Sequence, residues 1–482
     1  MYYIGIDLGT SSLKALLVDR DGKIIKEAAE SYPVRYPKEG WSEQDPADWL
    51  VAAERVLDAL TQGIKREIGG ISFGGQMHGL VLLDANDEVI RPCILWNDGR
   101  TQKQTDYLNG VIGKEKLSRL TANIAFAGFT APKILWVKEN EPENFRKISK
   151  IMLPKDYLAY MLTGVHSTDY SDASGTLLLD VKNKRWSDEM LEICGVKKEW
   201  LPALYESDDV IGKVREKYGM PNAVVTAGAG DNAAAAIGTG TVKDGDCNIS
   251  LGTSGTVFIA GDRFSVDGKN ALHAFAHATG KWHLMGCILS AASCNKWWTE
   301  DILQSKDYDA AEGSREKPGK NSVYFLPYLM GERSPHNDVN ARGCFIGMRP
   351  DTTRADMSLA VLEGVAFALK DCVEVAASNG IKVKSTKICG GGARSALWKK
   401  IIANVLNVEV ISPETEQGPS YGAAILAMVG NGEYPDVETA CAKLVKPLES
   451  VLPDAETASL YAERYASFKK LYPALKDFFN GK

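Results

Sequence analysis

The sequence predicts an α/β protein built from two similar halves, and three observations lead to this fold class. The segment Leu8 to Ser11 recurs as Leu251 to Ser254, about half of the 482-residue chain later. Both copies lie between two runs of strand-forming residues and before a turn signal. Further along, a short strand pattern runs into glycines and then into a helical pattern, which is typical of α/β folds. A duplicated strand–turn–strand unit explains the repeat.

Composition places the chain among globular proteins and excludes several functions. It has 56 Lys and Arg against 62 Asp and Glu, a net charge of −6. Nucleic acids and anionic membranes need clustered positive charge, so neither is an expected partner. The nine cysteines are an odd number without C-x-x-C spacing, which is typical of a reducing compartment. The N-terminus resembles no signal peptide, and we therefore expect a cytoplasmic protein.

The elements of the first half follow in order. Strands are expected at residues 2–6, 14–18, 71–73 and 80–83. A helix is expected from residue 45 to residue 64, because Asp45 is a typical N-cap and Pro46 suits the first helical position. A further apolar run at residues 223–227 leads into an alanine-rich segment.

The second half opens with expected strands at residues 247–250 and 255–260. Apolar residues recur at helical spacing from residue 353 to 377, and helices are also expected at 396–406 and 455–479. A strand at 387–389 ends in Gly390, Gly391 and Gly392. Because no low-complexity linker separates the halves, we expect a hinge between two domains, residues 1–244 and 245–482.

The repeated turn is the first candidate site. In the first copy an acid, Asp7, ends the strand and hydroxyl residues follow it; the second copy has the hydroxyls without an acid. Backbone N–H groups and hydroxyls of such turns can face phosphate oxygens, and the acid can hold Mg²⁺ through water. Two ordinary hairpin turns are the alternative, but the matched pair favours a nucleotide triphosphate held by both copies. The hydroxyl residues are Thr10, Ser11 and Ser12 in the first copy, and Thr253 and Ser254 in the second.

The glycine run is the second candidate site. Gly391 and Gly392 follow a strand and precede a helix, and glycines let the backbone approach a flat ligand such as adenosine closely. A plain strand-to-helix connection explains the same residues, and on this pattern alone both interpretations stay open. The chain contains no P-loop sequence, and its other glycine pairs lack the dinucleotide-binding spacing.

A third set of residues suits a hydroxylated substrate. Asp231 follows the apolar run at 223–227 and precedes a helix, a position from which a carboxylate can take a proton from a substrate hydroxyl. It could equally cap the helix, and both roles can hold at once. Met77, His78 and Trp96 lie in polar and aromatic clusters that suit a sugar. Core packing for Trp96 and an ordinary loop histidine for His78 are the alternatives.

Together these motifs resemble the FGGY carbohydrate kinases, along nearly the whole chain. Gly128 to Trp136 and Gly343 to Glu363 resemble the two signatures of that family. Five further motifs are most similar to the bacterial xylulokinase members of the family: Trp41 to Pro46, Gln76 to Gly79, Trp96 to Arg100, Leu153 to Tyr157 and Gly331 to Asn337.

The resemblance implies an actin/hexokinase-like fold, in which two ribonuclease-H-like domains enclose a central cleft for Mg-ATP. The implied activity is ATP-dependent phosphorylation of D-xylulose to D-xylulose 5-phosphate. The N-terminal domain would bind the sugar and carry the base and the first phosphate loop, and the C-terminal domain would carry the second loop and the adenosine site. The alternatives are a kinase for another ketose or polyol, and a nucleotide-switched binding ATPase of the same fold. A homodimer is also compatible with the resemblance.

The resemblance further assigns roles to single residues. Asp231 would be the general base, and Asp7 would orient Mg²⁺. The phosphates would lie near Thr10, Ser11, Ser12, Thr253 and Ser254, the adenosine near Gly391 and Gly392, and the sugar near Met77, His78, Trp96 and Asn232. Ser12 departs from the glycine that is common at its position in xylulokinases.

Overall fold

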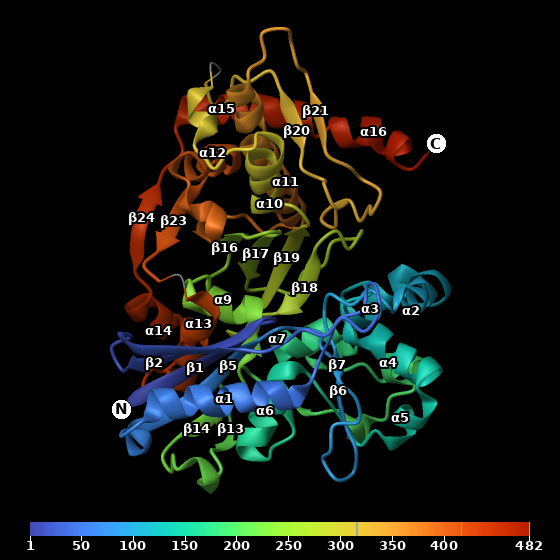
Figure 1. Ribbon diagram of the computed structural model, residues 1–482, viewed down its shortest axis with the longest axis vertical. Coiled ribbons are helices and arrows are strands. Elements are labelled where there is room, and N and C mark those ends of the chain that lie inside the picture. Colours follow the sequence, from blue (N-terminus) through green and yellow to red (C-terminus); the bar gives the residue numbers. More distant parts are fainter. Residues whose placement is uncertain (315–316, 416, 482) are drawn as a thin grey trace. The chain divides into compact units, whose positions relative to one another are not determined.

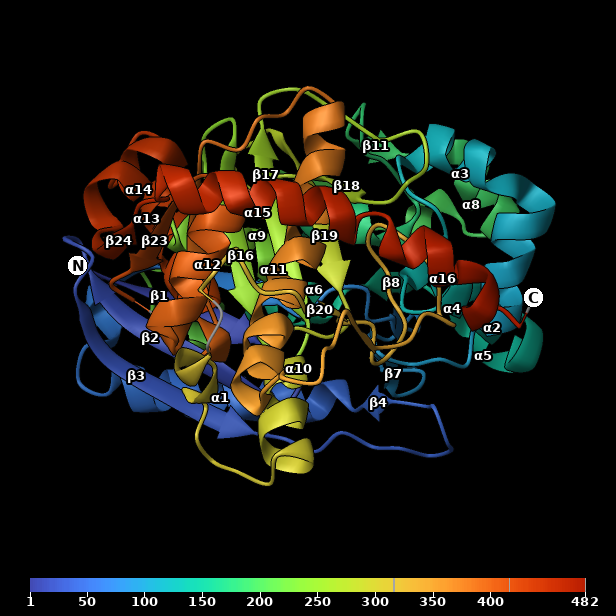
Figure 2. The ribbon, with the colours of Figure 1, turned by 90° about the horizontal axis from the view of Figure 1, so that it is seen from above.

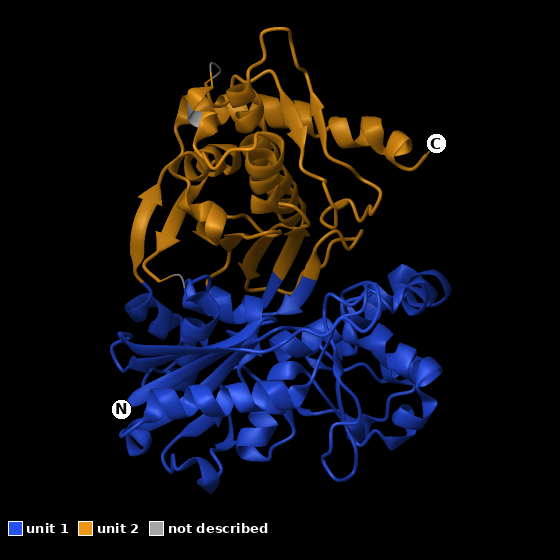
Figure 3. Ribbon diagram, in the orientation of Figure 1, with its two compact units in different colours: residues 1–242, 274–283, 417–445 blue, residues 243–273, 284–416, 446–482 orange. Residues whose placement is uncertain are grey.

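The computed structural model describes residues 1–314, 317–415 and 417–481. The chain forms two compact units (Figure 3): unit 1 comprises residues 1–242, 274–283 and 417–445, and unit 2 comprises residues 243–273, 284–416 and 446–482. The chain passes from unit 1 to unit 2 after Val242, but two later segments, residues 274–283 and 417–445, also belong to unit 1. Local sequence patterns do not predict that these later segments belong to unit 1. The expected domain boundary between residues 244 and 245 stays a prediction.

Unit 1 contains a mixed sheet in which the first strand is central. The strand order is β13 (Val210–Lys213), β14 (Val224–Thr226), β5 (Ile68–Gly75), β1 (Tyr2–Leu8), β2 (Ser12–Asp19) and β3 (Ile24–Ser31), with β15 (Ala229–Gly230) beside the end of β5. β1 pairs antiparallel with β2 and parallel with β5, which pairs parallel with β14. The strands expected at 2–6, 14–18 and 71–73 are confirmed as parts of β1, β2 and β5.

The alternation of β1 explains how helices cover both faces of this sheet (Figure 1). Ile4 and its neighbours two and four residues on pack against α1 (Pro46–Thr61), whereas Tyr3 faces α13 (Gly418–Gly430) and α9 (Asp231–Gly238). Helix α13 lies so close that a Cβ atom on Gly5 would be 1.9 Å from the Ser420 carbonyl oxygen. As expected, Asp45 caps α1, accepting a hydrogen bond of 3.0 Å from the Ala47 N–H.

Unit 1 contains further helices and short strands. They are β4 (Glu43–Gln44), β6 (Val81–Leu83), β7 (Cys93–Ile94), α2 (Gln102–Asp106), α3 (Lys114–Thr121), α4 (Thr130–Asn140), α5 (Pro142–Lys147), β8 (Lys150–Met152), α6 (Pro154–Thr163), β9 (Ser167–Asp169), α7 (Tyr170–Ala173), β10 (Leu179–Asp180), β11 (Arg185–Trp186), α8 (Asp188–Cys194), β12 (Ala203–Tyr205) and α14 (Val437–Leu444).

The sheet of unit 2 repeats the topology of the first, which confirms the duplication. Its order is β18 (His273–Ala276), β19 (Trp282–Ile288), β17 (Gly255–Gly261), β16 (Asp246–Leu251), β22 (Ser385–Cys389), β23 (Glu409–Pro413) and β24 (Pro447–Val451). β18 is an additional strand, and residues 274–276 of β18 and 282–283 of β19 belong to unit 1. β16 pairs antiparallel with β17 and parallel with β22, as β1 does with β2 and β5. β23 then adds in parallel and β24 in antiparallel orientation, as β14 and β13 do.

Unit 2 also carries the long helix that the apolar spacing predicts. This is α11 (Arg354–Ser378), which begins with a capping box between Thr353 and Asp356. The expected helix at 396–406 is α12 (Ala396–Leu406), and α15 (Ala455–Phe468) lies beside it (Figure 2). The expected helical segment 455–479 divides into α15 and α16 (Leu471–Phe479). The remaining elements are α10 (Ala292–Lys296), β20 (Tyr324–Leu326) and β21 (Cys344–Ile346).

Two observations concern the whole described chain. All nine cysteines are free thiols, each buried or partly buried. Among the described residues, no helix combines the length and the apolar composition needed to cross a membrane.

Candidate active site

The first phosphate-loop candidate is the tight turn between β1 and β2. The Gly9 N–H donates to the Ser12 carbonyl at 3.1 Å, and the Tyr32 hydroxyl donates to the Gly9 carbonyl. Asp7 lies next to the last residue of β1, in register with Gly74 of β5. The strand therefore ends as the sequence predicts, with the acid directly before the hydroxyl-bearing turn.

The structure brings Asp7 close to Asp231. Burial raises the pKa of Asp7 to about 7, and the negative charge of Asp231 adds to that rise. Burial likewise raises the pKa of Asp231 to about 6, although hydrogen bonds from Asn232 act in the opposite direction. Two neighbouring carboxyl groups whose pKa values are raised toward neutrality are a common feature of acid–base sites.

Asn232 orients the Asp231 carboxylate. Both its backbone N–H and its side-chain Nδ2 donate to Oδ1 of Asp231, at 2.7 and 2.9 Å. Gly230 occupies the N-cap position and Asp231 is the first residue of α9, so the alternative that Asp231 caps this helix is wrong. From the first helical position, Asp231 Oδ1 accepts the Asn232 N–H, one of the N–H groups at the start of α9 that have no partner within the helix.

A chain of polar contacts joins Trp96 to the first phosphate-loop candidate. Trp96 Nε1 donates to Thr10 Oγ1 at 3.0 Å, and Thr10 Oγ1 donates to Gln76 Oε1 at 3.4 Å. Gln76 Nε2 donates to Gln44 Oε1, and Gln44 Nε2 donates to the Thr10 carbonyl at 2.6 Å. Trp96 is 45% exposed, so the alternative that it is a core residue is wrong. The two glutamines were not predicted as site residues, and their only signal was their place in the family-like motifs.

Met77 lies against Gly230, the residue that precedes Asp231, and His78 lies against Gly175. A Cβ atom on Gly230 would be 3.0 Å from the Met77 sulfur, and one on Gly175 would be 2.5 Å from the His78 ring. His78 has a left-handed backbone with φ of 69°, and its Nδ1 lies 2.7 Å from the Gly175 carbonyl oxygen. Its ring stacks on Phe129, with ring centroids 4.6 Å apart. The predicted base and sugar residues therefore gather in one place in unit 1.

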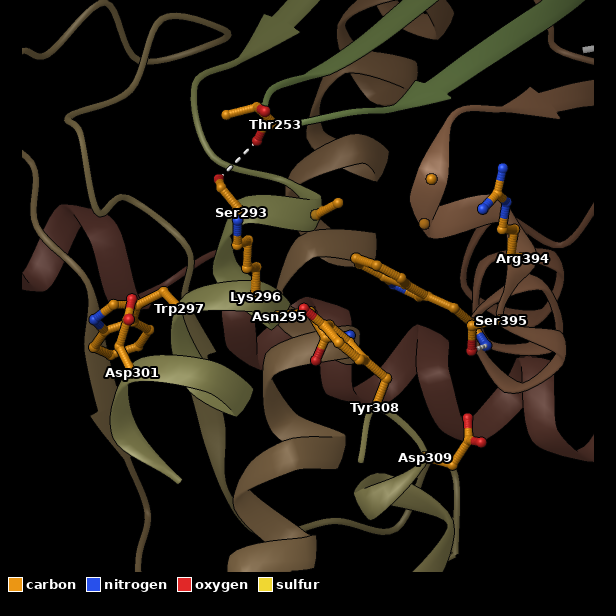
Figure 4. A pocket seen from close by; sticks show the side chains of 14 residues that line it. Thr253, Ser293, Asn295, Lys296, Trp297, Asp301, Tyr308, Asp309, Arg394 and Ser395 are labelled. Carbon is orange, nitrogen blue, oxygen red and sulfur yellow. Dashed lines mark hydrogen bonds between the residues drawn. The ribbon is translucent and has the colours of Figure 1, made fainter. Parts of the chain in front are cut away.

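Unit 2 contains a pocket of about 770 Å³ (Figure 4). Ser293 Oγ donates to the Thr253 carbonyl at 2.7 Å, and Figure 4 shows this pair on the side of the pocket opposite Arg394 and Ser395. Ser254, which follows Thr253 in the turn, is exposed, and it is not one of the described residues that line the pocket. The lining residues are Thr253, Ala292, Ser293, Asn295, Lys296, Trp297, Asp301, Tyr308, Asp309, Gly391, Gly392, Arg394, Ser395 and Trp398.

The two predicted glycines border this pocket in different ways. A Cβ atom on Gly392 would be 2.9 Å from the Trp398 ring, whereas one on Gly391 would meet no described atom within 4 Å. Gly390 has φ of 87° and so requires glycine. The open space at Gly391 and the size of the pocket suit a nucleoside.

Several lining residues were missed by the sequence analysis. Trp297, Asp301 and Tyr308 come from the π-helical turn at Trp297–Ile302 and the loop after it, and π-turns are frequent at functional sites. Nothing in their local sequence pattern indicates a ligand, because they reach this pocket only through the fold, which brings the turn and the distant glycine run to one cavity.

A divalent cation can bind in unit 1 only if waters or substrate phosphates complete its coordination shell. Among the residues described, no group of three or more His, Cys, Asp and Glu side chains could hold a metal. Mg²⁺, however, is often held by one or two carboxylates together with waters and substrate phosphates. A cation beside Asp7 would also offset the like charges of Asp7 and Asp231, so this chemistry fits.

Comparison with known proteins gives matches along nearly the full length. The model of the FGGY carbohydrate kinase N-terminal domain matches residues 2–238, and that of the C-terminal domain matches residues 247–430. The xylulose kinase of Escherichia coli strain K12 is 40% identical, covering 98% of this chain and 99% of that protein.

Solved structures agree with these matches. A "xyloylose kinase" from Brucella ovis is 41% identical with a TM-score of 0.94, covering 99% of this chain and 100% of its own. A gluconate kinase from Lactobacillus acidophilus also reaches a TM-score of 0.94 at 27% identity, covering 100% of this chain and 99% of its own.

Proposed function

Because this chain belongs to the FGGY family of carbohydrate kinases, as its motifs predict, we propose that it phosphorylates D-xylulose with ATP. The products are D-xylulose 5-phosphate and ADP. The observation that carries the proposal is the Asp231 carboxylate. Burial raises its pKa to about 6, it lies close to Asp7, and the residue before it, Gly230, packs against Met77. The substrate rests on the full-length relatives that bear the name xylulose kinase.

Family membership also confirms the expected actin/hexokinase-like, duplicated α/β fold, since solved relatives match nearly the whole chain with a TM-score of 0.94. The alternative of a nucleotide-switched binding ATPase loses its support, because the chain is a member of a carbohydrate kinase family.

In the proposed reaction, Asp231 accepts the proton of the sugar's terminal hydroxyl as that oxygen attacks the γ-phosphorus. The bond from the γ-phosphorus to the β–γ bridging oxygen breaks, and ADP leaves with the electron pair of that bond. Asn232 holds Oδ1 of Asp231 through two hydrogen bonds, so we assign proton acceptance to Oδ2. A pKa of about 6 leaves Asp231 mostly ionised at pH 7 while keeping it basic enough to act as a general base.

The phosphate and metal roles of the two turns are part of the proposal. Asp7 would hold Mg²⁺ through water, and the cation when bound would neutralise charge on the phosphates. The hydroxyls and N–H groups of the turns would donate to phosphate oxygens. These donors come from Ser11, Ser12, Thr253 and Ser254, and from the N–H of Thr10, whose hydroxyl already donates to Gln76.

Nucleoside and sugar are assigned to different units. The adenosine would lie in the 770 Å³ pocket of unit 2, against Gly391 and Gly392. The sugar would lie in unit 1, where His78 and Trp96 supply polar groups and Met77 an apolar contact. Asn232 Nδ2 donates one hydrogen to Asp231, and Asn232 would contact the sugar through its side-chain oxygen and its second N–H.

Another ketose or polyol is the second candidate substrate, and one observation favours keeping it. The gluconate kinase from Lactobacillus acidophilus matches the fold as well as the xylulose kinases do, at 27% identity. Fold alone therefore does not select the substrate.

An ADP-release assay with Mg-ATP tests the substrate. The panel is D-xylulose, D-ribulose, L-ribulose, gluconate, glycerol and no sugar. Preference for D-xylulose supports the proposal, and preference for another sugar would keep the reaction and replace the substrate. Release of ADP that no sugar stimulates would overturn the kinase proposal itself.

The expected cytoplasmic location and homodimer also remain proposals. The nine free thiols fit a reducing compartment. Light scattering of the purified protein tests the dimer, and a mass close to 52.4 kDa, that of one chain, would exclude it.

A further inference from the structure

A buried lysine contacts the sugar site that was assigned to unit 1. Lys133 lies on α4 with an exposed fraction of 0%. Its Nζ donates to the His78 carbonyl at 2.8 Å, and within the described ranges it forms no ion pair with a carboxylate. Burying an ammonium group is costly unless its hydrogen bonds are well used. The position of this group therefore requires a specific reason.

The start of α4 holds His78 at two points. Thr130 Oγ1 donates to the same His78 carbonyl at 3.1 Å, and Phe129, the residue before it, stacks on the His78 ring. The His78 backbone has φ of 69°, a left-handed conformation that a residue with a side chain rarely adopts. Two donors on one carbonyl stabilise that conformation, and with it the direction of the ring.

Burial and nearby charged groups act on the amino group that donates the hydrogen bond to the His78 carbonyl. Burial lowers the pKa of Lys133 to about 7, Cys93 and Asp98 raise it, and Arg100 lowers it. Asp98 is itself engaged, because its carboxylate accepts hydrogen bonds from Arg100 and from the Ser42 N–H. The ammonium group is thus directed to the His78 carbonyl and not to a carboxylate.

We propose that Lys133 is a positioning residue of the sugar pocket, which fixes the backbone of His78 and so presents the His78 ring to the substrate's hydroxyl groups. The proposal rests on the sugar-binding role of His78. The hydrogen bond that Lys133 donates is to His78, so its loss should weaken sugar binding without changing ATP binding by unit 2.

Kinetics of Lys133→Met test this role. We expect the KM for D-xylulose to rise tenfold or more, with the KM for ATP unchanged and kcat within about threefold of wild type, because uniform sugar binding is lost. Thr130→Val, which removes the longer hydrogen bond, should raise the same KM by about two- to threefold. Lys370→Met is the matched control, since Lys370 Nζ also donates to a backbone carbonyl at 2.8 Å, that of Val405 in unit 2. It should leave the sugar KM unchanged.

A double-mutant cycle separates positioning from general destabilisation. If Lys133 acts through His78, Lys133→Met should add little to the KM increase that His78→Ala causes alone. Fully additive increases, an unchanged sugar KM in Lys133→Met, or an equal rise in the ATP KM would each overturn the proposal.

A measurement without substrate keeps the inference independent of the proposed function. The chain has six histidines, so the side-chain NMR signals of His78 can be identified from their loss in His78→Ala. They should shift in Lys133→Met and Thr130→Val but not in Lys370→Met. Unshifted His78 signals would refute the positioning role, whereas shifted signals in a protein that phosphorylates no sugar would refute only the kinase proposal.

Discussion

Replacement of Asp231 by asparagine is the substitution that tests the proposed chemistry most sharply. Asparagine keeps the shape of the side chain and one oxygen, which can still accept both hydrogen bonds from Asn232 at 2.7 and 2.9 Å. The second position then carries an NH₂ group, whose nitrogen lone pair is delocalised into the carbonyl and cannot take the proton. The variant therefore removes the base while keeping the local contacts.

The expected loss follows from the contribution of a general base. Such a group accelerates a reaction by about 10² to 10⁴, which corresponds to about 3 to 5 kcal/mol of activation free energy. We expect kcat for D-xylulose, measured by ADP release at saturating Mg-ATP, to fall by this factor. The melting temperature should change little, because asparagine preserves the contacts to Asn232.

A surface substitution of the same type provides the control. Asp58→Asn on α1 removes a carboxylate that pairs with Lys65 at 2.9 Å in an exposed position, and such pairs contribute little. It should leave kcat unchanged. An Asp231→Asn enzyme with near-normal kcat and an intact fold would refute the assignment of the base.

The remaining predictions concern pH, the nucleotide pocket and helix packing. The kcat/KM for D-xylulose should fall as the pH drops below about 6, because the raised pKa of Asp231 is about 6 and the protonated form cannot act as a base. Gly391→Ala should leave the melting temperature unchanged yet raise the KM for ATP several-fold, because its Cβ would enter the open pocket. Gly392→Ala should lower the melting temperature, because its Cβ would be 2.9 Å from the Trp398 ring. Gly238→Ala should destabilise the fold by roughly 1–3 kcal/mol or more, because its Cβ would be 2.0 Å from a backbone oxygen of α13.

Each of these has an outcome that contradicts it. A pH profile that stays flat between pH 5 and 7 would argue against a base with a pKa of about 6. An unaltered KM for ATP in Gly391→Ala would remove the adenosine assignment. A Gly238→Ala protein that melts like wild type would mean that α9 and α13 tolerate separation.

Local sequence patterns predicted the parts of the site that depend on neighbouring residues. The turn after Asp7 and its repeat could be found because strand, turn and hydroxyls follow one another directly in the chain. The helix at 396–406 was predicted with its observed bounds. In the structure the Ser395 side chain caps it by accepting from the Trp398 N–H.

The parts that depend on distant residues could not be predicted in this way. Helix α13 joins unit 1 because its backbone packs directly on Gly5, some 400 residues earlier in the chain. Trp297 and Tyr308 line the pocket of unit 2 because the fold brings them to the same cavity as Gly391 and Gly392, which lie far from them in the chain. Local patterns carry no information about such contacts, so these residues became visible only in the structure.

The product of the reaction tests the central claim most directly. Purified protein is incubated with D-xylulose and Mg-ATP, and the phosphorylated sugar is analysed by ³¹P and ¹³C NMR. We expect phosphate on the C5 oxygen of D-xylulose in the wild-type reaction and, at early times, about a hundredth of that product or less from Asp231→Asn. Phosphate at another position, equal product from the variant, or no sugar phosphate at all would contradict it.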